Sequence, residues 1–490
     1  MKTIFFRSAI LLALGLSLGL GSCDDKLNID PAQSVDATTA LGNEANVGSA
    51  VVGMYAQLDA PSLYGTDLIL VPEILAAENY IQFQGSFLNY RQFFFRTTNS
   101  QNATAETTWR GAYQAINQAN LIIEALPVVS TQTLKTQYEG EARFIRALMH
   151  FELVRLYAKQ YMAGGANTQL GVPINLVPVK TVQEASVVKT RATVEEVYTQ
   201  VISDLRAAID LLPENNPTRA TTYTAKALLA RVYLQQSNFA QARIQADEVI
   251  KGSRRTLSPT LSSVFTGRNT SESLLEIQQN DQNNAGTSNS GLATHFSCIG
   301  QQGRGDVRVL SAFADQYGAT DARGRASLLY VGTCPSRGAG QLRSGKWVTY
   351  GQNIPVIRLA EMYLIRAETA FRAGDLNEAL SDINTIRLRS NATPLTASTL
   401  TLASILRERQ LELAFEGFRL HDLKRTGTNI FVPASGSDPA REIDINSDIL
   451  VLPIPQREIN VNLARTKQLM ETTLTIKPLT NWIGGKSPAI

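Results

Sequence analysis

The chain has 490 residues and a nearly balanced charge, with 46 lysine and arginine residues against 43 aspartate and glutamate residues. This balance argues against nucleic acid as a partner, because proteins that bind nucleic acids usually carry a strongly basic patch. The length allows one large domain. Beyond residue 22, no apolar run reaches the roughly 18 consecutive residues that indicate a membrane-spanning helix. The sequence therefore predicts no membrane-spanning helix in this part of the chain.

Residues 1–22 have the composition of a secretory signal peptide. Lys2 and Arg7 give a positively charged start, and an apolar run follows at 9–20. A membrane-spanning helix needs roughly 20 apolar residues, so this run is too short to span and is typical of a signal-peptide core. An ordinary signal peptide followed by a chance cysteine is one interpretation. Small residues directly before Cys23, as in a bacterial lipobox, favour a lipoprotein.

We therefore expect residues 1–22 to be removed and Cys23 to be acylated as the first residue of the mature chain. Two or more acyl chains give durable attachment, because each buried methylene contributes about 0.8 kcal/mol. Residues 23–40 are largely polar and are expected to form a tether. The tether leads to a predicted single domain at 41–490.

Most of that domain has the period of amphipathic helices. Apolar stripes cover residues 105–126 and 134–160. A third stripe begins at Thr193, where Thr193 and Glu196 have the spacing of a capping box. Pro213 ends this helix.

Two segments, 225–250 and 361–386, resemble one another as helix–turn–helix units. Asn238 and Asp375 occupy equivalent N-cap positions, and each is followed three residues later by a Gln or Glu. This is the pattern of a tetratricopeptide repeat. The equivalent positions, 238 and 375, are much further apart than one repeat length, so we expect discontinuous helix pairs rather than a tandem array.

Two segments near 61–104 and 255–350 lack this period and are predicted to be loop insertions on the helical scaffold. Loops on a rigid scaffold often carry binding residues. The first insertion has seven aromatic residues among the eighteen from Glu78 to Phe95. Aromatic faces and amide side chains suit the apolar faces and hydroxyl groups of sugars. The predicted ligand-binding residues are Asn79, Tyr80, Phe83, Phe87 and Tyr90, together with Trp347 of the second insertion.

Some of these aromatic residues could instead pack beneath the loop, and a core role for Trp347 is equally plausible. The second insertion also offers polar candidates: Asn283, Asn284, His295, Arg304 and Asp306. Residues 426–490 contain prolines and short apolar runs and are expected to be rich in loops.

The sequence has no recognisable catalytic or metal-binding motif. The three histidines, His150, His295 and His421, are not in a metal-binding spacing. His150 is expected to be structural, and an interhelical hydrogen bond is the expected role of His421. We therefore expect a binding protein rather than an enzyme, with no catalytic residue, metal or cofactor.

Three acidic residues and two cysteines are also functional candidates. Glu408, Glu412 and Glu416 alternate with arginines, and we interpret them as a charged helix face rather than a glycosidase pair, whose carboxylate separation cannot be read from spacing. Cys298 and Cys334 could pair in an oxidising compartment. They could equally remain two buried thiols, and the sequence leaves both possibilities open.

Five short motifs follow one another along the chain. WRGAY at 109–113 and GEARFIRA at 140–147 come first, and PVIRLAEMYLIRAET follows at 355–369. The longest motif, ILRERQLELAFEGFRLHDLKR, occupies 405–425, and LPIPQREIN occupies 452–460. In this order they resemble the signature of the SusD/RagB family of Bacteroidetes, with His421 as the main departure. The resemblance covers nearly the whole mature chain.

The resemblance implies a mostly α-helical fold of discontinuous tetratricopeptide-like helix pairs, with a loop-rich region and a few short strands. It also implies a lipid-anchored protein of the outer membrane that faces the cell exterior and works with a SusC-like TonB-dependent transporter. Family members capture nutrients, most often glycans, so an oligo- or polysaccharide is the expected ligand. Peptides are the alternative, because aromatic and asparagine side chains serve either ligand.

Overall fold

The computed structural model describes residues 40–461, except for 186, 188, 287–289, 301, 335–338 and 435–438. The predicted signal peptide, the predicted lipidation site Cys23 and nearly all of the predicted tether lie outside the described residues. The chain divides into two compact units after Gly42, and the fold belongs to the unit that begins at Asn43.

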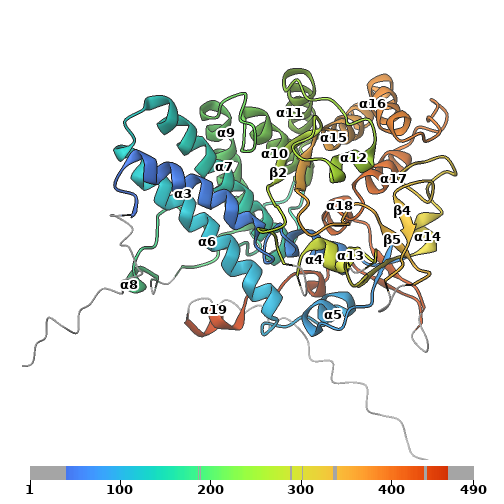
Figure 1. Ribbon diagram of the computed structural model, residues 1–490, viewed down its shortest axis with the longest axis horizontal. Coiled ribbons are helices and arrows are strands. Elements are labelled where there is room, and N and C mark those ends of the chain that lie inside the picture. Colours follow the sequence, from blue (N-terminus) through green and yellow to red (C-terminus); the bar gives the residue numbers. More distant parts are fainter. Residues whose placement is uncertain are drawn as a thin grey trace, which may run out of the picture. The chain divides into compact units, whose positions relative to one another are not determined.

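Helices packed side by side form the scaffold (Figure 1). Each of them contacts the next, from α6 through α7, α9, α10 and α11 to α15, and α15 contacts both α16 and α17. The helices predicted from the three apolar stripes are present as α6, α7 and α9. The scaffold helices are α3 (Glu44–Ala56), α6 (Ala103–Ala125), α7 (Gln132–Tyr157), α9 (Val194–Leu211), α10 (Thr222–Gln235), α11 (Phe239–Gly252), α15 (Leu359–Arg372), α16 (Leu376–Arg389), α17 (Leu402–Leu413) and α18 (Arg419–Thr426).

The two predicted helix–turn–helix units are α10–α11 and α15–α16. Asn238 and Asp375 accept hydrogen bonds from the backbone N–H groups of Gln241 and Glu378, as N-cap residues do. Arg243 of α11 donates to the carboxylates of both Asp375 and Glu378. The second helices of the two units are therefore joined directly, and the prediction of discontinuous helix pairs is confirmed.

The first insertion is more regular than the sequence indicated. Residues 61–104 include α4 (Asp67–Leu75), β1 (Ile81–Phe83) and α5 (Leu88–Phe95), so the expectation of an irregular segment is wrong for α4 and α5. Every residue of α4 is buried. A helix that is buried on all sides has no polar face, and so it lacks the amphipathic period that marks surface helices.

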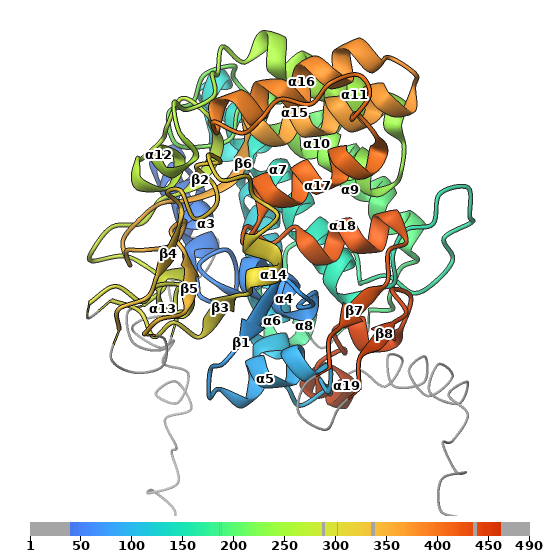
Figure 2. The same cartoon turned by 90° about the vertical axis from the view of Figure 1, so that its right-hand side faces the viewer.

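The second insertion contains short elements, as expected, and these include four of the eight described strands, β2 to β5. The strands of the described residues form four antiparallel pairs, β1–β3, β2–β6, β4–β5 and β7–β8. Figure 2 shows β1, β3, β4 and β5 gathered in one region, apart from the helix pair α15–α16. The short elements are α8 (Val182–Ala185), α12 (Leu261–Thr266), β2 (Ser273–Ile277), α13 (Leu292–Phe296), β3 (Val307–Val309), α14 (Ser311–Ala314), β4 (Leu329–Val331), β5 (Leu342–Ser344), β6 (Ile354–Arg358), β7 (Ile430–Val432), β8 (Arg441–Ile443) and α19 (Gln456–Val461).

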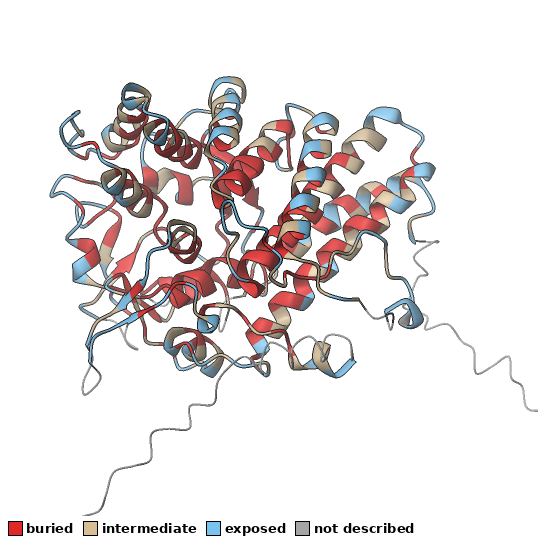
Figure 3. Ribbon diagram, turned by 180° about the vertical axis from the view of Figure 1, so that it is seen from behind, coloured by how far each residue is buried: buried red, intermediate tan, exposed pale blue. Residues whose placement is uncertain are grey.

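Buried residues are concentrated where the helices face one another (Figure 3). Helices α15, α16 and α17 share an apolar cluster that includes Ala360, Leu364, Ala367 and Ile383, all of them fully buried. Alanine at the contact lets two helix backbones approach closely, which is why a small residue occupies position 367.

A cluster of buried charges lies at the end of α17. Arg358 donates to the carboxylates of Glu272, Glu412 and Glu416 at 2.9, 2.7 and 2.8 Å, and all four side chains are buried. Burial alone would raise the pKa of Glu412, but the surrounding guanidinium groups outweigh it and hold that pKa well below its usual range. The predicted charged helix face holds for Glu408 and Glu412, which lie on α17 but are turned to the interior, whereas Glu416 lies in the turn that follows the helix.

The two scaffold histidines differ in their partners. His150 is structural, as predicted, because its Nδ1 lies 3.0 Å from the Arg146 carbonyl and its Nε2 accepts from the Asn175 N–H. The predicted interhelical hydrogen bond of His421 is wrong, because neither ring nitrogen of this buried side chain has a hydrogen-bond partner among the described residues. Burial and nearby positive charges lower the pKa of His421 well below its usual range, so the ring is neutral.

Replacing Glu412 with glutamine should destabilise the fold strongly. The change would leave Arg358 and its neighbouring guanidinium groups buried with too little negative charge, which typically costs about 3–5 kcal/mol. Urea denaturation followed by circular dichroism would measure the loss. The matched control is Glu248→Gln, because Glu248 pairs with Lys226 while 43% exposed, and exposed pairs contribute about 1 kcal/mol or less. Equal losses in the two variants would contradict the assigned role of the cluster.

The buried Lys424 should make the free energy of unfolding depend on pH. Its Nζ is buried and, among the described residues, donates only to the Arg155 carbonyl, at 3.4 Å. Burial, aided by the charge of Arg155, lowers the Lys424 pKa from 10.5 to about 7. Between these two values the unfolded chain holds the proton and the folded chain does not, so the free energy of unfolding rises with pH in this window.

Lys424→Met should remove this contribution. The wild type should gain about 2 kcal/mol of stability relative to the variant between pH 7 and pH 9. Urea midpoints at the two pH values would test this. Lys251→Met is the control, because Lys251 is exposed, and it should give the same difference from wild type at both values. A Lys424→Met difference that does not change with pH would refute the argument.

Candidate functional site

The two insertions meet in one antiparallel strand pair. β1 pairs with β3 so that Gln82 lies opposite Arg308, and the Gln84 N–H donates to the Asp306 carbonyl at 2.6 Å. Side chains alternate between the two faces of a strand, so the residues that flank Gln82 and Arg308 point inward and are buried. Five half-buried side chains lie on this pair or close to it along the chain, and we call them the loop face: Gln82, Gln84, Phe87, Arg304 and Arg308.

Phe87 and Arg304 form the aromatic part of the loop face. The guanidinium carbon of Arg304 lies 4.5 Å from the centre of the Phe87 ring, a cation–π arrangement. The Nε of Arg304 also donates to the Asp306 carboxylate at 3.1 Å. The guanidinium group is thereby fixed over the ring, and the ring remains half-buried rather than enclosed.

Beneath Arg304, a chain of buried polar groups holds Asp306 in place. The Asp306 carboxylate contacts His295 Nδ1 at 3.0 Å, and the His295 ring lies edge-on to Tyr90 with 4.9 Å between centroids. Burial lowers the pKa of His295, so the ring is neutral. Burial would raise the pKa of Asp306, but hydrogen bonds from His295 and Arg304 outweigh it and lower that pKa.

The chain of polar groups ends in the scaffold. The Tyr90 hydroxyl donates to Asp67 of α4 at 2.7 Å, and Thr108 of α6 lies 3.4 Å from the same carboxylate. Burial raises the pKa of Asp67 to about 7 despite these hydrogen bonds. The loop face is thus connected to α4 of the first insertion and to α6 of the scaffold.

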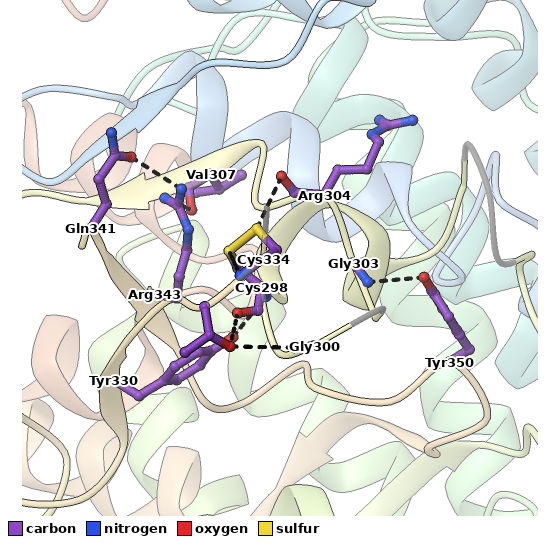
Figure 4. Close-up of a disulfide and its surroundings, with 11 residues drawn as sticks. Cys298, Gly300, Gly303, Arg304, Val307, Tyr330, Cys334, Gln341, Arg343 and Tyr350 are labelled. Carbon is purple, nitrogen blue, oxygen red and sulfur yellow. Dashed lines mark hydrogen bonds between the residues drawn. A yellow bond between two sulfur atoms is a disulfide. The ribbon is translucent and has the colours of Figure 1, made fainter. Parts of the chain in front are cut away.

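A disulfide between Cys298 and Cys334 fastens the segment before β3 (Figure 4). The sequence left this pairing open, and the structure shows that it forms. Tyr330 and Tyr350 support the same segment, because their hydroxyl groups accept hydrogen bonds from the backbone N–H groups of Cys298 and Gly303 at 2.9 Å each. The backbone that positions Arg304 is therefore held covalently on one side and by two tyrosines.

Gly303 is needed for the turn in this segment. Its φ is +76°, in the region that favours glycine. A Cβ atom at this position would clash with the carbonyl oxygen of Ser297. No other residue fits without moving the backbone that leads to Arg304.

Four of the six residues predicted to bind ligand are buried, and their predicted role as platforms is corrected. Tyr80 is 1% exposed, and its ring is stacked on Phe415. Trp347 is fully buried, and its Nε1 donates to the Phe415 carbonyl at 2.7 Å. Phe83 and Tyr90 are also buried. None of these rings offers a face to a ligand, because each is enclosed by the protein.

Asn79 and Phe87 remain accessible, although the structure separates them. Asn79 is exposed and precedes β1, whereas Phe87 is half-buried and follows it. Only Phe87 joins the loop face, and the role of Asn79 in ligand binding stays a prediction. Asn283 and Asn284 lie in a turn in which Asn284 donates to the Asn280 carbonyl, so that turn is organised by local hydrogen bonds.

The ligand-binding residues predicted from the sequence did not include Gln82, Gln84 or Arg308. The alternation of apolar and polar residues in Ile81-Gln82-Phe83-Gln84 is typical of a half-buried strand, and it could have indicated which side chains face outward. So short a run is not distinctive. Only the pairing with β3, which lies far along the chain, identifies these residues as a strand.

Two cavities lie apart from the loop face. One of about 280 Å³ lies between α17 and α18 and is lined by residues of the 405–425 motif. The other, of about 620 Å³, follows α6 and is lined by Trp109, Tyr113 and Asn117, among others. Neither is lined by a residue of the loop face.

Other site types find no support in the part of the chain that the structure describes. Within that part, no group of three or more His, Cys, Asp or Glu side chains is placed to hold a metal ion. Among the described helices, none combines the length and the apolar character needed to cross a bilayer.

Two family models match this chain. A family of starch-binding proteins that associate with the outer membrane matches residues 35–234, and the SusD family matches residues 338–471. SusD-like protein P2 of Formosa agariphila is 28% identical to this chain, over 91% of this chain and 97% of its own length. The similarity therefore extends over both the helical scaffold and the insertions.

Solved structures show the same fold. A SusD superfamily protein from Bacteroides vulgatus superposes with a TM-score of 0.76 at 24% identity, covering 86% of this chain and 97% of its own. A laminarin-binding SusD-like protein superposes with a TM-score of 0.69 at 22% identity, covering 86% and 98%. The motifs, the discontinuous helix pairs and these matches agree, and the chain belongs to the SusD family.

Proposed function

We propose that this protein captures an oligo- or polysaccharide at the cell surface through the loop face. The observation that carries the proposal is the half-buried Phe87 ring, over which Arg304 is fixed at 4.5 Å. A sugar ring can rest its apolar face against such an aromatic ring. The Gln84 amide donates to Gln82 Oε1 at 3.3 Å, so we assign the amide N–H groups of Gln82 as the donors for sugar hydroxyl groups.

The chemistry of the loop face supports binding rather than catalysis. Its carboxylate, Asp306, is engaged by both His295 and Arg304. The lowered pKa of Asp306 makes it a weak base near neutral pH. His295 is neutral and buried, and it has no contact with solvent. We assign the site no catalytic residue.

The proposal includes an anchor and a recipient. Acyl chains on Cys23 would hold the protein at the outer membrane, facing outward, and a SusC-like TonB-dependent transporter would receive the captured glycan. The lipobox-like sequence supports the anchor, and the outer-membrane association of the matching family supports the location. Peptides are the alternative ligand, and a binding screen decides between the two.

Replacing Phe87 with alanine should weaken glycan binding. The loss of one aromatic face typically costs about 0.5–1.5 kcal/mol, which corresponds to an affinity that is about 2- to 12-fold lower. Affinity electrophoresis and calorimetry on residues 24–490, against a panel of polysaccharides, oligosaccharides and peptides, would measure it. Binding to peptides alone would exclude the glycan proposal.

Phe95→Ala is the matched control for this experiment. Phe95 lies at the other end of α5, is 52% exposed and also has an arginine near its ring, with Arg91 at 5.8 Å. Its loss should leave glycan affinity unchanged, because it is not part of the loop face. If Phe95→Ala weakens binding as much as Phe87→Ala does, the site is not where we place it.

The anchor and the recipient can be tested together. The wild-type chain should sediment with outer membranes and co-purify with a TonB-dependent barrel in mild detergent. Cys23→Ala should abolish membrane attachment, because acylation requires the thiol. Recovery of the wild type only as a free monomer, while the neighbouring transporter is expressed, would argue against the partnership.

A further inference from the structure

Arginines outnumber carboxylates around the loop face. Among the described residues, the charge at the site itself comes from Arg304, Arg308 and Arg343, against the single carboxylate of Asp306. Because Arg304 and Asp306 form an ion pair, the net charge is that of the other two arginines.

Arg308 is a cation without a partner among the residues that the structure describes. It is half-buried on the outward side of β3, opposite Gln82. Its side chain forms no hydrogen bond or ion pair with any described residue. A structural arginine in a partly buried position normally has a carboxylate or carbonyl partner, as Arg304 does with Asp306. The five N–H donors of Arg308 are therefore available to a ligand.

Arg343 adds a second uncompensated charge beneath the first. It is fully buried and donates to the Val307 carbonyl and the Gln341 side chain at 3.0 and 3.1 Å, both of them neutral acceptors. Burial, together with repulsion from Arg308, lowers the Arg343 pKa to about 10. The group is still charged at neutral pH, and no carboxylate among the described residues pairs with it.

The charge of Asp306 raises the Arg343 pKa, but burial outweighs it. The Asp306 carboxylate is shared between Arg304 and His295. The nearest acidic residue after β3, Asp315, is paired with Arg325. Among the described residues no carboxylate pairs with Arg308 or Arg343, so their positive charge is left to attract an anionic ligand.

We propose that the glycan captured by the loop face is acidic and that a carboxylate or sulfate group of the polymer is recognised by Arg308 beside the Phe87 ring. This inference rests on the proposed function and narrows it from glycans in general to anionic ones. Guanidinium groups bind both anions through paired hydrogen bonds. The structure assigns the ring to the sugar and the cation to its acidic substituent.

Matched polymers test the charge directly. Polygalacturonate and its methyl ester share a backbone and differ in the carboxylate, and dextran sulfate and dextran differ in the sulfate. Calorimetry on residues 24–490 should show that at least one charged polymer binds more tightly than its neutral counterpart. The preferred member identifies carboxylate or sulfate as the recognised group. Its affinity should also fall when NaCl is raised from about 0.05 to about 0.5 M, because salt screens exposed charges.

Variants locate the effect. Arg308→Gln should weaken binding of the charged polymer about two- to fivefold, the range expected of an exposed ion pair, and should leave binding of the neutral polymer unchanged. Arg110→Gln is the matched control, because Arg110 is an exposed arginine on α6 outside the loop face. It should change neither affinity.

The outcomes separate this inference from the proposed function. Equal or tighter binding of the neutral polymer would overturn the acidic ligand while leaving glycan capture intact. Loss of affinity in Arg110→Gln equal to that in Arg308→Gln would also overturn it, because the attraction would then be diffuse. Failure to bind any of the four polymers would overturn this inference. Failure to bind any member of the wider glycan panel would count against the proposed function itself.

Discussion

The tight turn at residues 414–417 is the constraint on which the rest of the structure depends. Phe415 has a φ of +67°, a left-handed conformation that a bulky residue rarely adopts. Its N–H donates to the Tyr80 hydroxyl, and its carbonyl accepts from Trp347 Nε1, both at 2.7 Å. Gly417 has a φ of +85°, and its N–H donates to Glu73. The surrounding side chains thus over-determine the turn and sustain its strain.

The buried charges secure the same turn from its other side. Glu416 pairs with Arg358, and Lys346 Nζ donates to the carbonyls of Glu412 and Ala414 at 2.8 Å each. Groups from the first insertion, the second insertion and the helical scaffold therefore converge on one short turn. Removing one charge would leave the others buried without compensation, so the parts cannot separate without a large cost in free energy.

This convergence explains what the sequence could and could not predict. The helix pairs were predictable because their signals are local: caps at Asn238 and Asp375, and an apolar period along each helix. Tyr80 and Phe87 lie close together in one aromatic-rich segment, and nothing local distinguishes them. Tyr80 is committed to Phe415, 335 residues away, whereas Phe87 stays half-exposed. Composition identifies the aromatic-rich segment, but only tertiary contacts separate its buried residues from those that stay half-exposed.

The Cys298–Cys334 disulfide and the buried helix α4 reflect the same limit. The spacing of two cysteines does not fix the distance between their Cβ atoms. A helix buried on every face carries no periodic signal. In both cases the outcome depends on contacts with residues distant along the chain. A single sequence does not show which distant residues meet.

Buried and half-buried residues alternate along β1. Ile81 and Phe83 point inward, whereas Gln82 points outward. Substitutions at outward positions that contact little usually change stability by no more than about 0.5 kcal/mol, whereas buried aromatic residues cost several times that. Residues of the loop face such as Gln82, Phe87 and Arg308 can therefore be substituted while the turn at 414–417 stays intact. The motif at 405–425 includes that turn and none of the loop face, which is why the motif identifies the family but not the ligand.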